Sequence, residues 1–265
     1  MSVSSSKYFS KLILWTSSHG KDHHYLPFWL EKRFKYSSFS KPKIEAISGG
    51  RITYSLVHEI SCKAIKLSPQ PQIHVVIYGD NNLRPNRRDS EEIFDTLQYF
   101  RLLISNFSNF PNCHLIIASL IPCPLTDPTS KEKFRHFNEA LNQLINTENE
   151  RGFQRISFLN LTNTFIFQGE IQDEEAMFEP DGIHFTSRGA LELTDRLLEH
   201  LRIIPIDLNF QKKSKFPANW WVFHRGLRFP ITVSGFSPWF FFSFFSTFPI
   251  NFHFFFHSYF WSFLS

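Results

Sequence analysis

An aspartate and a histidine stand three residues apart in the short stretch Asp181-Gly182-Ile183-His184. Residues at this spacing can lie on the same side of one turn, so the carboxylate can fix the imidazole in one tautomer and stabilise its protonated form. Such a pair needs only a serine to form a nucleophilic catalytic triad. The plainer interpretation is that Asp-Gly makes a turn and that His184 precedes the next helix. The rest of the chain decides between the two.

Short apolar runs alternate with segments of helical periodicity along the first two hundred residues. Strands are predicted over 11–16, 44–47, 73–78, 115–121 and 156–161. Helices are predicted over 21–35, 54–67, 89–103, 129–144 and 186–201. Most of the strands are continuously apolar, which is typical of a parallel sheet buried on both faces. We therefore expect an α/β fold, a three-layer α/β/α sandwich with a five-stranded parallel sheet of the flavodoxin-like kind.

Polar and small residues follow the predicted strands at the positions where such folds bind ligands. Ser18 follows the first strand, Gly50 the second and Asn81 the third. The loop with Asp181 and His184 follows the fifth strand. Because the carboxyl ends of parallel strands meet at one edge of the sheet, we expect these residues to lie close together.

Four ordered blocks of the sequence resemble those of the SGNH hydrolases, also called GDSL-type lipases and esterases. The resemblance covers roughly Lys11 to Leu201. The blocks are Ser17-Ser18-His19-Gly20, Ser48-Gly49-Gly50, Gly79-Asp80-Asn81-Asn82-Leu83-Arg84 and Asp181-Gly182-Ile183-His184. Each block alone is a weak signal, since serines cap helices and Gly-Gly and Asn-Asn make turns. The four together, in this order and at these strand ends, are specific.

The resemblance implies a role for each residue. Ser18 is the nucleophile, His184 its general base and Asp181 the carboxylate that orients the base. The oxyanion hole comprises the backbone N–H groups of Ser18 and Gly50 and the side-chain amide of Asn81. The implied reaction cleaves a small-molecule ester through an acyl-serine intermediate, with no cofactor and no metal.

Three residues depart from the family pattern. The first block usually reads Gly-Asp-Ser, but here it is Thr16-Ser17-Ser18, so the Thr16 side chain is expected to crowd the turn. Ser17 replaces an acid and is a second candidate nucleophile. Asn82 replaces the usual aspartate of the third block. These departures motivate the alternative function, a catalytically inactive binding or structural module with the same fold. A further resemblance, to esterase-like domains of retroelement-derived reading frames, suggests such an origin.

Composition divides the chain into residues 1–210, the hydrolase-like domain, and 211–265, a basic linker and a Phe- and Ser-rich tail. No charged residue follows Arg228. The tail reads either as a translated non-coding or frame-shifted stretch, which we favour, or as a disordered or membrane-associated segment. Its three prolines, His253 and His257 argue against a membrane span.

Charge and cysteine content restrict the partners and the compartment. The net charge of +4 is too small to indicate nucleic-acid binding. The three cysteines lack paired spacing, and we expect Cys113 and Cys123 to be buried thiols of an intracellular protein. The apolar run near the N-terminus lacks the pattern of a signal peptide. His23 and His24 are only a faint indication of a metal site.

Overall fold

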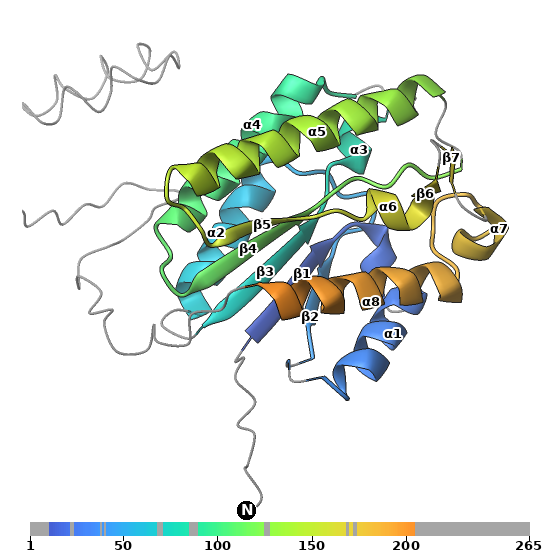
Figure 1. Ribbon diagram of the computed structural model, residues 1–265, viewed down its shortest axis with the longest axis horizontal. Coiled ribbons are helices and arrows are strands. Elements are labelled where there is room, and N and C mark those ends of the chain that lie inside the picture. The colour runs from blue at the N-terminus through green and yellow to red at the C-terminus, as the bar shows by residue number, and fades with distance from the viewer. Residues whose placement is uncertain are drawn as a thin grey trace, which may run out of the picture. The chain divides into compact units, whose positions relative to one another are not determined.

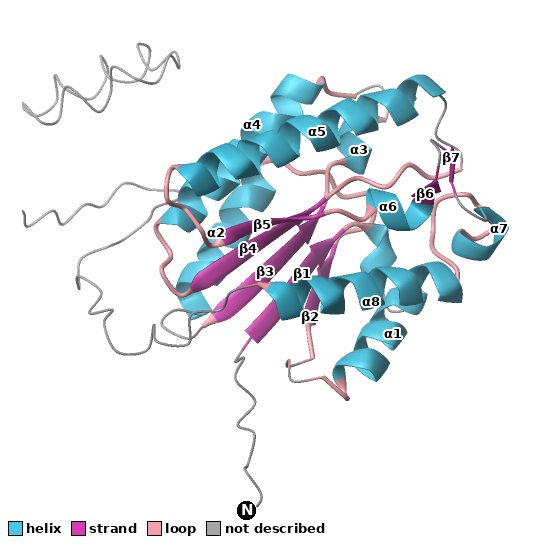
Figure 2. Ribbon diagram, viewed as in Figure 1, coloured by secondary structure: helices cyan, strands magenta, loops and turns pink. Residues whose placement is uncertain are grey.

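The computed structural model describes residues 11–204, apart from 22–23, 38, 40, 68–70, 85–89, 125–127, 168–169 and 172–173. Five strands form one sheet: β1 (Lys11–Thr16), β2 (Lys43–Ala46), β3 (Gln72–Ile77), β4 (Cys113–Ala118) and β5 (Ile156–Leu159). Their order is β2-β1-β3-β4-β5, and every neighbouring pair is parallel. The predicted five-stranded parallel sheet is confirmed (Figure 2).

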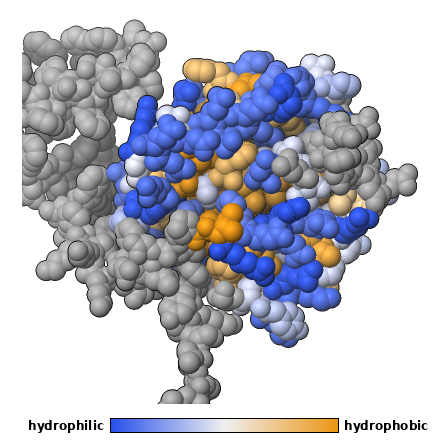
Figure 3. Space-filling model, viewed as in Figure 1, coloured by the Kyte–Doolittle hydropathy of each residue, from blue (hydrophilic) through white to orange (hydrophobic). Residues whose placement is uncertain are grey.

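Helices cover both faces of the sheet, which gives the expected three layers (Figure 1). One face carries α1 (Tyr25–Phe34) and α8 (Ser187–Ile203), which pack against each other. The other face carries α2 (Tyr54–Leu67), α4 (Ile93–Ser108) and α5 (Pro128–Glu150). The exposed faces of α5 and α8 are largely hydrophilic in the view of Figure 3, because these helices turn their apolar sides to the sheet.

The side chains of β1 show how the sheet serves two cores. Leu12 and Leu14 pack into the apolar cluster beneath α1 and α8. Ile13 and Trp15 point the other way, into the cluster beneath α2, α4 and α5. Both faces are buried because successive side chains of a strand alternate between faces. This accounts for the continuously apolar sequence.

Several short elements were not predicted. They are the 3-10 turn η1 (Ser18–Gly20), α3 (Asp80–Leu83), α6 (Thr162–Phe165), β6 (Ile166–Phe167), β7 (Glu170–Ile171) and α7 (Glu174–Met177). Their sequences are too short to show a periodicity. The prediction for α4 began too early, because Glu91 is held outside the helix by tertiary contacts.

Two smaller predictions are confirmed. Cys113 and Cys123 are buried, and the structure shows no disulfide among the described residues. Thr186, one of two candidate caps, begins α8: its hydroxyl oxygen accepts the backbone N–H of Gly189 at 3.2 Å. The predictions for the tail lie outside the described residues. Within the described part of the chain, no helix is long and apolar enough to cross a lipid bilayer.

A histidine is buried within β3. Trp15 Nε1 donates to His74 Nδ1 at 3.1 Å, and His74 Nε2 lies 2.8 Å from Gln72 Oε1. The indole is a donor only, so Nδ1 accepts and Nε2–H donates, and the ring is neutral. Burial, with a small contribution from Lys63, lowers the pKa of His74 to about 3.

We expect this histidine to make the protein acid-sensitive. Between about pH 6.5 and 3 the unfolded chain binds a proton at His74 that the folded chain does not, so stability falls as pH falls through this window. The slope is about 1.4 kcal/mol per pH unit for one such group. Urea unfolding between pH 7 and pH 5 measures it.

His74→Phe is expected to reduce that slope. The matched control, His136→Gln, removes an imidazole from the exposed surface of α5. An equal slope in the wild type and in His74→Phe would contradict the prediction.

Candidate active site

The first strand delivers Ser18 to the carboxyl edge of the sheet. Thr16 ends β1, and its carbonyl accepts the backbone N–H of Ile47 at 3.1 Å and the hydroxyl of Tyr78 at 2.5 Å. Ser17 bends the chain, and Ser18 opens the turn Ser18–Gly20. These anchors fix the strand end immediately before the candidate nucleophile.

A short hairpin-like loop delivers the aspartate and the histidine. Phe178 and Phe185 form an isolated antiparallel bridge at its base. Glu179 N donates to His184 O at 2.7 Å, and Gly182 N donates to Glu179 O at 2.8 Å. Gly182 has φ 62°, a left-handed conformation that glycine adopts without steric cost. The loop then leads directly into α8.

The structure brings the three predicted triad residues together. His184 Nε2 lies 3.0 Å from Ser18 Oγ, although the residues are 166 positions apart. His184 Nδ1 lies 2.5 Å from Asp181 Oδ2. Because the carboxylate can only accept, Nδ1 carries the proton and Nε2 is free to accept one from the serine hydroxyl. This is the geometry of a Ser-His-Asp proton-transfer chain.

The environment keeps the Asp181 carboxyl ionised. Burial raises its pKa, but hydrogen bonds outweigh this effect and lower the pKa to about 2. Oδ1 accepts the backbone N–H groups of Ile183 and His184, each at 2.9 Å. Oδ2 remains directed at the imidazole. The carboxylate therefore orients His184 through both the backbone and the ring.

Two further histidines contact His184, and sequence reasoning assigned neither of them to the triad. The ring of His24 stacks on His184 with centroids 4.2 Å apart and an interplanar angle of 15°. His19 meets His184 edge-on at 5.5 Å and stacks on Phe185 at 4.4 Å. Sequence spacing gives no signal for such stacking. These contacts restrict the orientation of the His184 ring.

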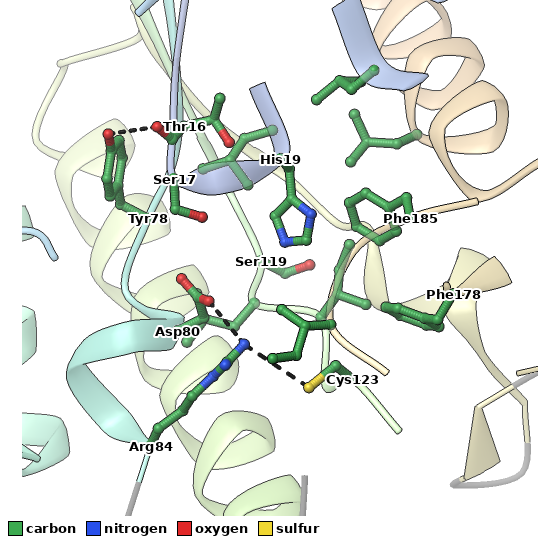
Figure 4. A pocket seen from close by; sticks show the side chains of 16 residues that line it. Thr16, Ser17, His19, Tyr78, Asp80, Arg84, Ser119, Cys123, Phe178 and Phe185 are labelled. Atoms are coloured by element: carbon green, nitrogen blue, oxygen red, sulfur yellow. Dashed lines mark hydrogen bonds and ion pairs between the residues drawn. The ribbon is translucent and has the colours of Figure 1, made fainter. Parts of the chain in front are cut away.

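His19 is a neutral group at ordinary pH. Burial first, and then the charges of His184, Arg84 and His24, lower its pKa to about 3. It lines a cavity of about 30 Å³ beneath the nucleophile turn, together with Ser17, Asp80 and Arg84. In Figure 4 the His19 ring points into this space, which has room for about one water molecule. Arg84 donates to Asp80 Oδ2 at 3.3 Å along its wall.

The predicted oxyanion residues lie at the ends of the second and third strands. Gly50 N donates to Ile47 O at 2.9 Å and closes a turn in which Gly49 has φ 62°. Asn81 Nδ2 donates to Gly50 O at 3.0 Å, which leaves the second amide hydrogen of Asn81 for another acceptor. Ser18 N–H has no acceptor among the described residues. The Gly50 N–H would have to be shared between Ile47 and an oxyanion.

Thr16 is accommodated by a glycine that follows the nucleophile. Its side chain is fully buried, and its hydroxyl has no partner among the described residues. A Cβ placed on Gly20 would lie 2.3 Å from Thr16 Cγ2 and 2.9 Å from Ile44 Cγ2. The expected crowding by Thr16 is therefore relieved because position 20 has no side chain.

Gly20→Ala should displace the nucleophile turn. We expect a loss of about 1–3 kcal/mol in the free energy of unfolding, typical of overpacking a core. Adding Thr16→Gly removes the nearest methyl group, so the double variant should recover part of the loss. Urea unfolding of the two single variants and the double variant measures this coupling. If the changes in the free energy of unfolding of the two single variants simply add in the double variant, the contact between Thr16 and position 20 is contradicted.

The structure also places Ser17 and Asn82, the two other residues that depart from the family pattern. Ser17 is buried, with 2% of its surface exposed, beside the small cavity. The side-chain amide of Asn82 makes two hydrogen bonds with the backbone of Ile52. Oδ1 accepts the Ile52 N–H and Nδ2 donates to the Ile52 C=O, each at 2.9 Å. An aspartate at this position would provide only the first of these bonds.

The described residues contain no group of three histidine, cysteine, aspartate or glutamate side chains arranged to hold a metal ion. His24, considered as a ligand from the sequence, instead stacks on His184. His23, His253 and His257 lie outside the described residues.

Comparison with solved structures identifies the fold. A lipolytic protein of the G-D-S-L family from Veillonella parvula superposes with TM-score 0.56 at 17% identity, covering 73% of this chain and 98% of that chain. A GDSL-like lipase from Bacteroides thetaiotaomicron superposes with TM-score 0.55 at 15% identity, covering 72% of this chain and 87% of that chain. A family 3 carbohydrate esterase from Clostridium thermocellum superposes with TM-score 0.52 at 16% identity, covering 72% of this chain and 96% of that chain.

The chain has the fold of the SGNH hydrolases, as the four sequence blocks predict. No protein-family profile matches the sequence, and no curated protein does.

Proposed function

We propose that this protein is a serine ester hydrolase that cleaves an acyl ester through an acyl-serine intermediate. The observation that carries the proposal is the chain of contacts from Ser18 through His184 to Asp181, at 3.0 and 2.5 Å. The solved structures of similar fold include a lipase and a carbohydrate esterase, which supports ester chemistry. No step of the proposed reaction needs a metal or cofactor.

The proposed reaction has two halves. His184 Nε2 takes the proton of Ser18 Oγ as the oxygen attacks the acyl carbonyl, and it then returns the proton to the leaving alcohol. Water, activated by the same imidazole, hydrolyses the acyl-serine. Asp181, which stays ionised, stabilises the imidazolium in both halves. The donors for the carbonyl oxygen are the backbone N–H of Ser18, the amide of Asn81 and, if it is shared, the N–H of Gly50.

Turnover of an activated ester tests the proposal. The purified full chain should hydrolyse p-nitrophenyl acetate with a pre-steady-state burst if deacylation is the slower half. Rapid acid quench followed by mass spectrometry should find an acetyl group on the peptide that contains Ser18. A folded protein that neither turns over the ester nor becomes acylated would refute the proposal.

The alternative is a non-catalytic binding or structural module with the same fold. The observation that favours it is the hydrogen bonding of the second and third blocks: Gly50 N–H is engaged with Ile47, and Asn81 with Gly50. If these bonds persist when a substrate analogue binds, the hole lacks the Gly50 N–H as a donor. The turnover assay distinguishes the two functions.

A further inference from the structure

A partly buried carboxylate lies at the centre of a hydrogen-bond network behind the predicted oxyanion hole. Glu91 Oε1 accepts Arg51 Nη2 at 2.7 Å, and Oε2 accepts Asn82 Nδ2 at 2.8 Å. The hydroxyls of Thr96 and Tyr99 donate to the same carboxylate, each at 3.3 Å. The Arg51 and Glu91 side chains are only 17% and 21% exposed. Four donors thus converge on one acceptor.

The network determines which way the Asn82 amide faces. Its two N–H groups go to Ile52 O and to Glu91, and its oxygen accepts Ile52 N–H. Only one orientation of the amide satisfies these partners, because the Glu91 carboxylate can only accept a hydrogen bond and the Ile52 N–H can only donate one. The backbone of Glu91 reinforces the arrangement, since its N–H donates to Asn82 O at 2.7 Å.

This arrangement joins the two segments that carry the predicted oxyanion donors. Asn82 belongs to the short helix α3, next to Asn81. Arg51 and Ile52 directly follow Gly50. The Asn82–Ile52 bonds and the Glu91–Arg51 ion pair therefore fix the distance between the Gly50 segment and Asn81. Displacement of about 1 Å in such a site can reduce the rate about 100-fold.

We propose that Glu91 is a positioning residue for the oxyanion hole, acting through Asn82 and Arg51. The inference rests on the proposed esterase function. It also explains the third departure from the family pattern. Asn82 lacks the carboxylate that the pattern places there, and Glu91, nine residues later, supplies that charge in contact with the Asn82 amide.

Exchanging the two groups tests this assignment. Glu91→Gln loses an acceptor, because one of the two carboxylate oxygens becomes an NH₂ group that faces either Arg51 or Asn82. Asn82→Asp places a second carboxylate against Glu91. In the double variant Asn82→Asp/Glu91→Gln, the introduced glutamine can donate to the introduced aspartate and still accept from Arg51. Glu91→Gln should therefore be harmful in the wild-type background but beneficial in the Asn82→Asp background.

The assays are steady-state kinetics on p-nitrophenyl acetate and amide hydrogen exchange of the peptide that covers residues 47–53, both on the full chain. Glu91→Gln should lower kcat about 10- to 100-fold with KM changed less than about 3-fold, and exchange should be faster. The double variant should recover at least about 10-fold in kcat over Asn82→Asp. The matched control is Glu92→Gln, whose side chain is 79% exposed.

Two outcomes would overturn the inference: Glu91→Gln behaves like Glu92→Gln, or the double variant is no better than Asn82→Asp. If the wild-type protein turns over no ester, the proposed function fails separately. In that case, amide hydrogen exchange of the peptide 47–53 tests whether Glu91 is a positioning residue. Faster exchange in Glu91→Gln that reverses in the double variant supports it, and unchanged exchange refutes it.

Discussion

Ser18→Ala should reduce ester hydrolysis by about a millionfold. The hydroxyl of Ser18 is the only group that the structure places at hydrogen-bond distance, 3.0 Å, from His184 Nε2 among the described residues. Removing it leaves the base without a nucleophile to activate. The change removes one oxygen from a partly exposed position, so the thermal unfolding midpoint should hardly change. Steady-state kinetics and thermal unfolding of the same preparation measure both effects.

Ser17→Ala is the matched control for that variant. Ser17 is the other serine of the block, but it is buried beneath the turn and lines the small cavity. It should retain most of the activity. Full activity in Ser18→Ala together with loss in Ser17→Ala would show that the block has been aligned one residue out of register.

Asp181→Asn should lower kcat about 10⁴-fold while the fold persists. The asparagine oxygen can still accept the backbone N–H groups of Ile183 and His184, as Oδ1 does now. Its NH₂ group then faces His184 Nδ1, which must become the acceptor. The proton moves to Nε2, and the imidazole can no longer take the proton of Ser18. Activity is lost because the imidazole has the wrong tautomer, although its position is unchanged.

Asp195→Asn provides the same chemical change outside the site, because Asp195 pairs with Arg33 at the surface of α8 at 2.7 Å. It should leave kcat unchanged. A comparison of kcat at several pH values in the two variants separates a triad effect from a general loss of charge. A loss of less than about 10-fold in Asp181→Asn would contradict the assigned role of the carboxylate.

The sequence predicted the arrangement of layers because its strong signals are local. The apolar runs of β1, β3 and β4 are buried on both faces of the sheet, and α2 has the bounds expected from its periodicity, Tyr54–Leu67. The meeting of Ser18 and His184 followed from topology, since both follow strands that end at one edge. Two distant parts of the chain could thus be placed together without any contact information.

What the sequence did not predict depends on side-chain contacts between distant segments. The stacking of His24 on His184 and the space that Gly20 leaves for Thr16 are results of packing. Glu91 resembles an ordinary acidic helix start, a position that carboxylates favour. Its contacts with Arg51 and Asn82 hold it outside α4 instead. Tertiary contacts override a local preference here.

Covalent labelling tests most directly whether Ser18, His184 and Asp181 form a working triad. The full chain would be treated with a fluorophosphonate probe beside Ser18→Ala, and labelled peptides would be identified by mass spectrometry. We predict one label, on Ser18, that is absent from the variant. A folded wild-type protein that takes no label, or that takes it on Ser17, would contradict the assignment of Ser18 as the nucleophile of the triad.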